Sequence, residues 1–84
     1  MSQIDKLILR IKNIDKNLRF EELEKVLNHY GYYMKETSGG SSHATFRKPN
    51  KTPITIPRHN PINKAYVILV KMVVESEDEN EENA

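Results

Sequence analysis

The sequence has no cysteine, no tryptophan and no long apolar run. The lack of cysteine and of a long apolar run excludes several classes of protein. Without cysteine, the 84-residue chain has neither disulfides nor thiolate ligands to reinforce a small core. Because no run of about 18 or more apolar residues is present, we expect no membrane span. The N-terminal residues also lack an uninterrupted apolar signal-peptide core. The composition therefore predicts one small soluble domain in the cytoplasm.

Acidic residues are missing from a long central segment. There is no Asp or Glu between Thr37 and Val74, whereas the segment from Glu75 onward carries six acids and no base. The other 74 residues hold 13 Lys and Arg against 6 Asp and Glu, a net charge of 13 − 6 = +7. Such a body suits a polyanion like RNA, because bound phosphates release their counterions. Scattered lysines that only keep the protein soluble are the alternative.

Two segments have the spacing of amphipathic helices. Apolar residues recur at i, i+3, i+4 and i+7 in residues 3–12, and Ser2 is placed to cap that helix. Residues 20–30 repeat the spacing with acids in the first turn, and Gly31 is placed to end the helix. We therefore predict helices over both segments.

Three short strands are predicted after these helices, at residues 32–37, 43–48 and 53–57. Short polar connections between them indicate an antiparallel meander. Residues 65–74 are almost continuously apolar and β-branched, so propensity favours a strand, although their length permits a buried helix. The acidic segment at residues 76–84 is predicted to be a disordered tail.

A histidine lies where a loop of glycine and serine meets the second predicted strand. In a strand, His43, Thr45 and Arg47 share one face, while Phe46 points to the other. A group that exchanges protons near neutral pH and a permanent cation would then occupy one surface. That combination suits chemistry on a phosphate.

The order of these elements, with the residues around His43, resembles the HicA family of toxins from bacterial type II toxin–antitoxin systems. The resemblance runs from Leu23 to about Val74. It is carried by a helix ending in Gly31-Tyr32, by Ser42-His43 opening a strand, by Phe46-Arg47-Lys48-Pro49 and by Ile56-Pro57-Arg58-His59. The chain departs from the family at Ser41, where glycine is usual, and at Ala44, where a second histidine is often found.

The resemblance implies an α+β fold similar to double-stranded RNA-binding domains, in the order α-β-β-β-α with a three-stranded antiparallel sheet. It implies a final helix at residues 64–75, against the strand propensity. We expect a single domain over residues 1–75, with an extra N-terminal helix at residues 2–13. The implied activity is cleavage of messenger RNA by a ribonuclease, and the implied partner is a HicB-like antitoxin that blocks the site.

The family's catalytic histidine corresponds to His43, which would act as acid and base on a ribose 2′-hydroxyl. The expected RNA-binding residues are Ser42, Arg47, Lys48, Lys51, Arg58 and His59, whose cations would stabilise charge on the phosphate. His59 is either a general acid or a residue that bonds the backbone, and we favour the second role. Because carboxylates are almost absent around His43, we expect neither a metal nor another cofactor.

Two other functions remain open from the sequence. The basic face could belong to a non-catalytic RNA-binding module, or the charges could be incidental in a protein-interaction domain. Tyr32, Tyr33 and Phe46 lie among basic residues and could stack unpaired bases, although core packing is the expected role for Phe46 and for one tyrosine.

Overall fold

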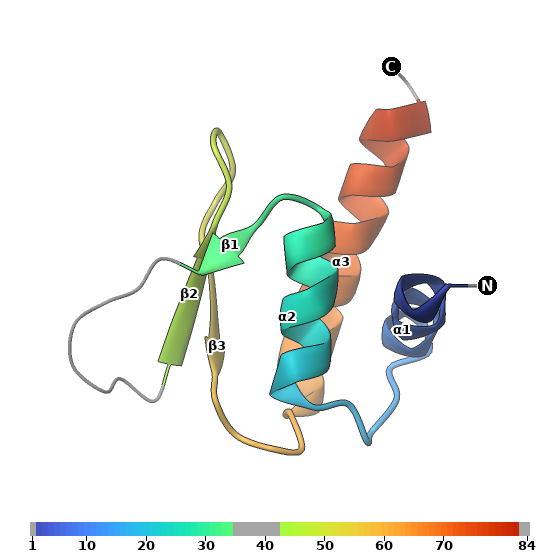
Figure 1. Ribbon diagram of the computed structural model, residues 1–84, viewed down its shortest axis with the longest axis vertical. Coiled ribbons are helices and arrows are strands. Elements are labelled where there is room, and N and C mark those ends of the chain that lie inside the picture. The colour runs from blue at the N-terminus through green and yellow to red at the C-terminus, as the bar shows by residue number, and fades with distance from the viewer. Residues whose placement is uncertain (1, 35–42, 83–84) are drawn as a thin grey trace.

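The structure is a computed structural model that describes residues 2–34 and 43–82, with side chains described up to residue 78. It contains helices α1 (Gln3–Lys12), α2 (Phe20–His29) and α3 (Lys64–Glu82), and strands β1 (Tyr33–Met34), β2 (His43–Arg47) and β3 (Ile54–Pro57) (Figure 1). This confirms the predicted α+β fold, with its order α-β-β-β-α and its extra N-terminal helix. The predicted first strand extends into residues 35–37, which lie outside the described residues.

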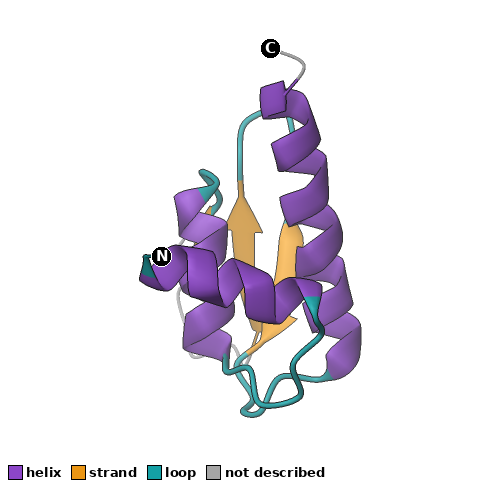
Figure 2. Cartoon of the chain, turned by 90° about the vertical axis from the view of Figure 1, so that its right-hand side faces the viewer, coloured by secondary structure: helices purple, strands orange, loops and turns teal. Residues whose placement is uncertain are grey.

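The three strands form one antiparallel sheet in the order β1-β2-β3. Helices α2 and α3 cover one face of this sheet, and α1 crosses their outer side (Figure 2). The molecule is therefore layered, with the sheet first, α2 and α3 next, and α1 last. Among the described residues no helix covers the opposite face of the sheet (Figure 1).

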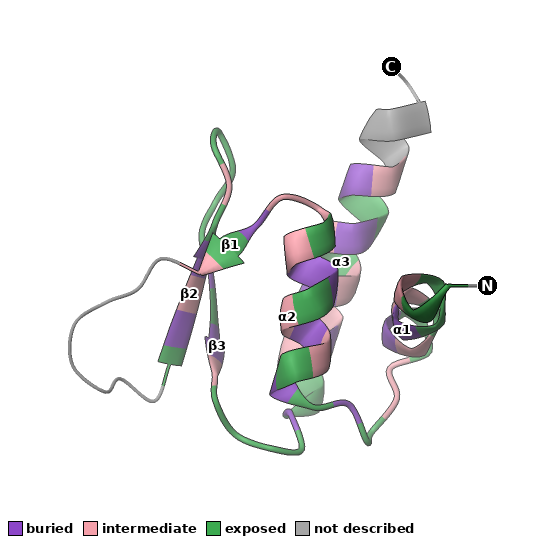
Figure 3. Cartoon of the chain, viewed as in Figure 1, coloured by how far each residue is buried: buried purple, intermediate pink, exposed green. Residues whose placement is uncertain are grey.

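The core fills the space between the sheet and the helices (Figure 3). Alternate residues of β2 and β3 point into it, as a period of two requires. The fully buried side chains come from every helix, from the two longer strands and from the α1–α2 connection: Ile11, Leu18, Leu23, Val26, Leu27, Phe46, Ile56, Val67, Val70 and Val74. Burial of these apolar side chains provides the main driving force for the fold.

The start of α1 and the end of α2 lie at signals that the sequence carries. Ser2 and Asp5 form a reciprocal capping box at the start of α1. Gly31 follows α2 with φ = +91°, a conformation that glycine adopts without the strain a side chain would add. Arg10 joins the two helices, because its guanidinium lies 2.6 Å from a carboxylate oxygen of Glu22.

Helix α3 decides between two conflicting expectations. The β-branched residues 65–74 favour a strand by propensity, whereas the family resemblance implies a helix, and the structure has the helix. Val67, Val70 and Val74 recur on one side of α3 and are buried against the core. Packing of this stripe outweighs the small intrinsic cost of β-branched residues in a helix.

The acidic C-terminal segment is helical up to Glu82, so the prediction of a disordered tail is wrong for residues 76–82. Two of its acids, Glu77 and Asp78, have partners in the body of the protein. Asp78 accepts a hydrogen bond of 2.9 Å from the Tyr30 hydroxyl and lies 3.5 Å from Lys12 Nζ. Glu77 pairs with Lys48. Residues 83 and 84 lie outside the described residues.

Candidate functional site

One surface of the sheet, which we call the open face, gathers polar and aromatic side chains. It consists of Tyr33 from β1, of His43, Thr45 and Arg47 from β2, and of Thr55 and Pro57 from β3. Ala44 and Phe46 are buried on the helix side, so β2 alternates as predicted. His43 and Arg47 therefore share a face.

His43 lies at one end of the open face. It is the first residue of β2, is exposed, and stands opposite Pro57 in the antiparallel pairing with β3. Directly opposed residues have Cα atoms about 4.5–5.5 Å apart, and each further residue adds at most about 3.8 Å. His59, two residues beyond Pro57, therefore has its Cα within roughly 13 Å of the His43 Cα. Ser42 lies outside the described residues.

A hollow adjoins this end of the open face. It encloses about 400 Å³ and is lined by Pro57, Arg58, His59, Asn63 and Tyr66. Pro57 belongs both to this hollow and to the cross-strand pair with His43. The hollow thus extends the histidine end of the sheet toward the start of α3.

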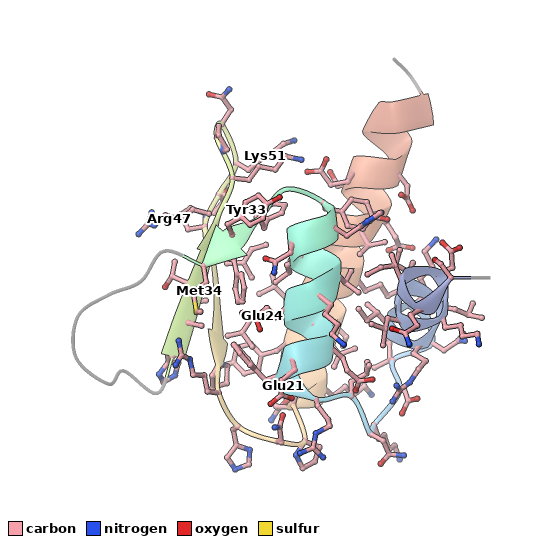
Figure 4. The ribbon with its side chains drawn as sticks, viewed as in Figure 1. Glu21, Glu24, Tyr33, Met34, Arg47 and Lys51 are labelled. Atoms are coloured by element: carbon pink, nitrogen blue, oxygen red, sulfur yellow. The ribbon has the colours of Figure 1, made fainter. Side chains whose placement is uncertain are left out.

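Arg47 and Tyr33 stand opposite each other at the other end of the open face. Both are exposed, and Figure 4 shows Arg47 pointing away from the helices. Arg47 makes no ion pair with any residue in the described part of the chain. Arg47 lies four positions along β2 from His43, which corresponds to about 13 Å along a strand. The two residues therefore occupy opposite ends of the open face.

Lys48 and Arg58 lie on the helix side of the sheet. Lys48 Nζ is 3.0 Å from Glu77 Oε2 and 5.5 Å from the centre of the Tyr32 ring. Arg58 donates a 3.0 Å hydrogen bond to the Met34 sulfur, and its guanidinium lies 6.0 Å from the centre of the Phe20 ring.

Lys51 lies in the exposed turn between β2 and β3, at the end of β2 away from His43. It lines a second hollow of about 290 Å³ between that turn and α3, together with Leu69 and Met72. The expected cations are thus distributed around the sheet, and only Arg47 shares the open face with His43.

The loop that carries Arg58 and His59 is anchored at two points in its second half. Asn60 Oδ1 accepts a 2.7 Å hydrogen bond from the Phe20 N–H, an unsatisfied donor at the start of α2. The Ile62 N–H donates a 3.0 Å bond to the Leu18 carbonyl. These bonds hold the loop against the α1–α2 connection, next to the histidine end of the sheet.

Tyr32 is the one candidate-site tyrosine that is enclosed. Burial raises the pKa of its hydroxyl above the usual value, and the nearby Glu77 carboxylate raises it further, while Lys48 acts in the opposite direction. Tyr32 and Phe46 are therefore core residues, as expected for Phe46 and one tyrosine, and Tyr33 is the exposed member of the three.

Several residues that shape the site carry no clear signal in the sequence. Asn63 and Tyr66 line the hollow beside His59, and Pro57 links it to His43, but each reads as an ordinary cap, core or turn residue. Residues 2–34 and 43–82 contain no group of three or more His, Cys, Asp or Glu side chains that could hold a metal ion. Nor do they contain a helix with the length and apolar character to cross a membrane.

Comparisons with known proteins give one match. A family model described as HicA toxin of bacterial toxin-antitoxin matches residues 20–68. The matched segment includes α2, all three strands, His43, His59 and the start of α3, whereas α1 and most of α3 lie outside it. No curated protein and no solved structure gave a significant match.

Proposed function

Because the chain belongs to the HicA family of toxins from bacterial toxin–antitoxin systems, we propose that it is a metal-independent endoribonuclease that cleaves messenger RNA. The observation that carries the proposal is the position of His43. His43 is exposed at the first position of β2, on a face that no described helix covers. It also lies inside the segment that matches the family. RNA can therefore approach its imidazole from solvent.

His43 acts as the acid and base of the reaction. Its neutral imidazole takes the proton from a ribose 2′-hydroxyl, and the 2′-oxygen attacks the adjacent phosphorus. The bond from phosphorus to the 5′-oxygen breaks, and that oxygen takes up the proton that the His43 imidazolium gives back. The products are a 2′,3′-cyclic phosphate and a 5′-hydroxyl. General base catalysis of this kind contributes about 10²- to 10⁴-fold.

The other expected RNA contacts divide by their place around the sheet. His59 and Arg58 follow β3 at the histidine end and bind RNA close to the cleaved bond, as does Ser42. Arg47 binds a more distant phosphate from the open face, and Lys51 attracts the strand from its exposed turn. Lys48 is paired with Glu77 on the helix side of the sheet, so it contributes least of the set to RNA binding.

The donor set supports cleavage without a metal ion. Segment 37–74 contains no Asp or Glu, so the sequence neighbours of His43, apart from Glu36, lack the carboxylates that hold Mg²⁺ in most metal nucleases. We therefore expect the 2′-hydroxyl of the substrate, with His43, to supply the nucleophile.

Family membership implies an antitoxin partner. We propose that this partner is a HicB-like protein that binds the toxin in the cytoplasm and covers the His43 end of the open face. Co-expression with such an antitoxin should restore growth to cells that express this chain.

Replacing the 2′-hydroxyl tests the chemistry directly. A single-stranded RNA with 2′-deoxy substitution at each cleaved nucleotide should bind normally but resist cleavage, because the nucleophile is missing. Cleavage of the substituted RNA at the same bonds would contradict the proposed mechanism. Binding of the unmodified RNA without any turnover would instead support the alternative, a non-catalytic RNA-binding module that uses the same basic face.

A further inference from the structure

Tyr33 is the aromatic side chain that the structure leaves exposed on the open face. Its relative exposure is 62%, whereas Tyr32 and Phe46 are 4% and 0% exposed. The sequence leaves all three as candidates for base stacking, and burial removes two of them. Exposed aromatic rings next to basic residues are the usual stacking platforms for unpaired bases.

Arg47 lies directly across from Tyr33. The register pairs the two residues, so their Cβ atoms are about 4.5–5.5 Å apart on one face. Arg47 makes no ion pair with a described residue, and the described residues of the open face include no acid. A guanidinium in this setting remains available for a phosphate.

Two short side chains, Thr45 and Thr55, lie between this pair and His43, and we call them the floor of the open face. Thr45 and Thr55 face each other in the middle of the open face, with their hydroxyl oxygens 3.1 Å apart. Their side chains are short, so an extended strand can lie across them. The floor spans the roughly 13 Å of β2 between Arg47 and His43.

We propose that Tyr33 and Arg47 form a subsite for one unpaired nucleotide of RNA, at a fixed distance from the bond that His43 cleaves. Tyr33 stacks on the base, and Arg47 binds a neighbouring phosphate. The inference rests on the proposed function, since His43 acts on the same RNA strand. The subsite requires unpaired RNA, because a base inside a duplex is already stacked on both sides.

Binding without cleavage isolates the subsite. On a His43→Ala background, the dissociation constant of a fluorescein-labelled, mixed-sequence single-stranded RNA is measured by anisotropy over a range of salt concentrations. Tyr33→Ala should weaken binding by about 5- to 150-fold at every salt concentration, which corresponds to the loss of one stacked base. Tyr33→Phe, which keeps the ring, should bind as the parent does.

Salt separates the roles of the two residues. Arg47→Ala should reduce the slope of log K against log salt by about 0.7, the value for one phosphate contact on a single strand, whereas Tyr33→Ala should leave the slope unchanged. Met72→Ala is the matched control, because Met72 is also 62% exposed but lies on α3, away from the open face. Its affinity and slope should equal those of the parent.

The position of the subsite is tested relative to the cleaved bond. The active protein first identifies the cleaved bond. Single bases are then removed along the RNA, and one abasic position at a constant distance from that bond should weaken binding to the His43→Ala protein. The same abasic position should have no added effect when Tyr33→Ala is also present. Equal affinities for Tyr33→Ala and Met72→Ala, or equal binding of duplex and single strand, would overturn the subsite. Cleavage that depends on His43 but not on Tyr33 would support the proposed ribonuclease function and contradict the subsite. RNA binding that depends on Tyr33, without any cleavage, would support the subsite and contradict the ribonuclease function.

Discussion

The ammonium group of Lys48 lies 3.0 Å from the Oε2 atom of Glu77, so the end of β2 is tied to the second half of α3. The side chains are only 25% and 11% exposed, which sets this pair apart from ordinary surface ion pairs. Lys48 also lies over the Tyr32 ring. The contact explains why the acidic segment continues as a helix rather than detaching from the body.

Loss of this ion pair should destabilise the fold. We predict that Glu77→Gln lowers the free energy of unfolding by about 1–2 kcal/mol, because Lys48 is left half-buried without its counter-charge. Glu75→Gln is the control, since Glu75 is exposed on the same helix. The free energy of unfolding of the two variants is measured in urea. Equal values would show that the Lys48–Glu77 ion pair does not stabilise the fold.

The same geometry predicts a difference between neighbouring cations in RNA binding. Arg47 points away from the helices, while Lys48 is held on their side of the sheet. Lys48→Met should therefore leave the salt dependence of RNA affinity close to that of the parent, whereas Arg47→Ala should lower it. A larger effect of Lys48→Met would mean that Lys48 leaves Glu77 to bind a phosphate.

Tyr32 makes stability sensitive to alkaline pH. Burial, followed by the charge of Glu77, raises its pKa in the folded protein above the ordinary value of about 10. The neutral phenol therefore contributes stability that is complete below about pH 10 and is lost as the pH rises through the raised pKa. Tyr32→Phe should lose less stability than the parent as the pH rises above about 10. Parallel pH curves would contradict this assignment.

Asn60 supplies the missing cap of α2 from 40 residues away in the sequence. Asn60→Ala should lower the free energy of unfolding by about 1 kcal/mol, because the Phe20 N–H loses its acceptor. Asn60→Asp keeps an acceptor oxygen but turns a second carboxylate oxygen toward Glu21, so it should recover only part of the loss in thermal or urea unfolding. An Ala variant as stable as the parent would exclude a capping role.

Local patterns in the sequence predict most of the fold. The helix over residues 3–12 follows from apolar spacing and the Ser2 cap, and the alternation of β2 follows from its period of two. Propensity misassigns residues 65–74, because their burial against the core depends on the rest of the chain. The helical continuation through Glu77 and Asp78 depends on distant partners, Lys48, Lys12 and Tyr30, that no local pattern reveals.

The candidate site was predictable only in part for the same reason. Sequence alternation places His43 and Arg47 on one face, and the structure has them there. It does not reveal that Tyr33, rather than Tyr32, is exposed, nor that Pro57 opposes His43, because both facts depend on the register between strands.

The most direct test of the central claim is cleavage of a long single-stranded RNA by the purified protein in the presence of EDTA. The parent is compared with His43→Ala and with His29→Ala, which removes an exposed histidine from the end of α2. The account predicts cleavage by the parent and by His29→Ala, with a rate about 10²- to 10⁴-fold lower for His43→Ala. Equal cleavage by all three proteins, or no cleavage by the parent while RNA remains bound, would contradict it.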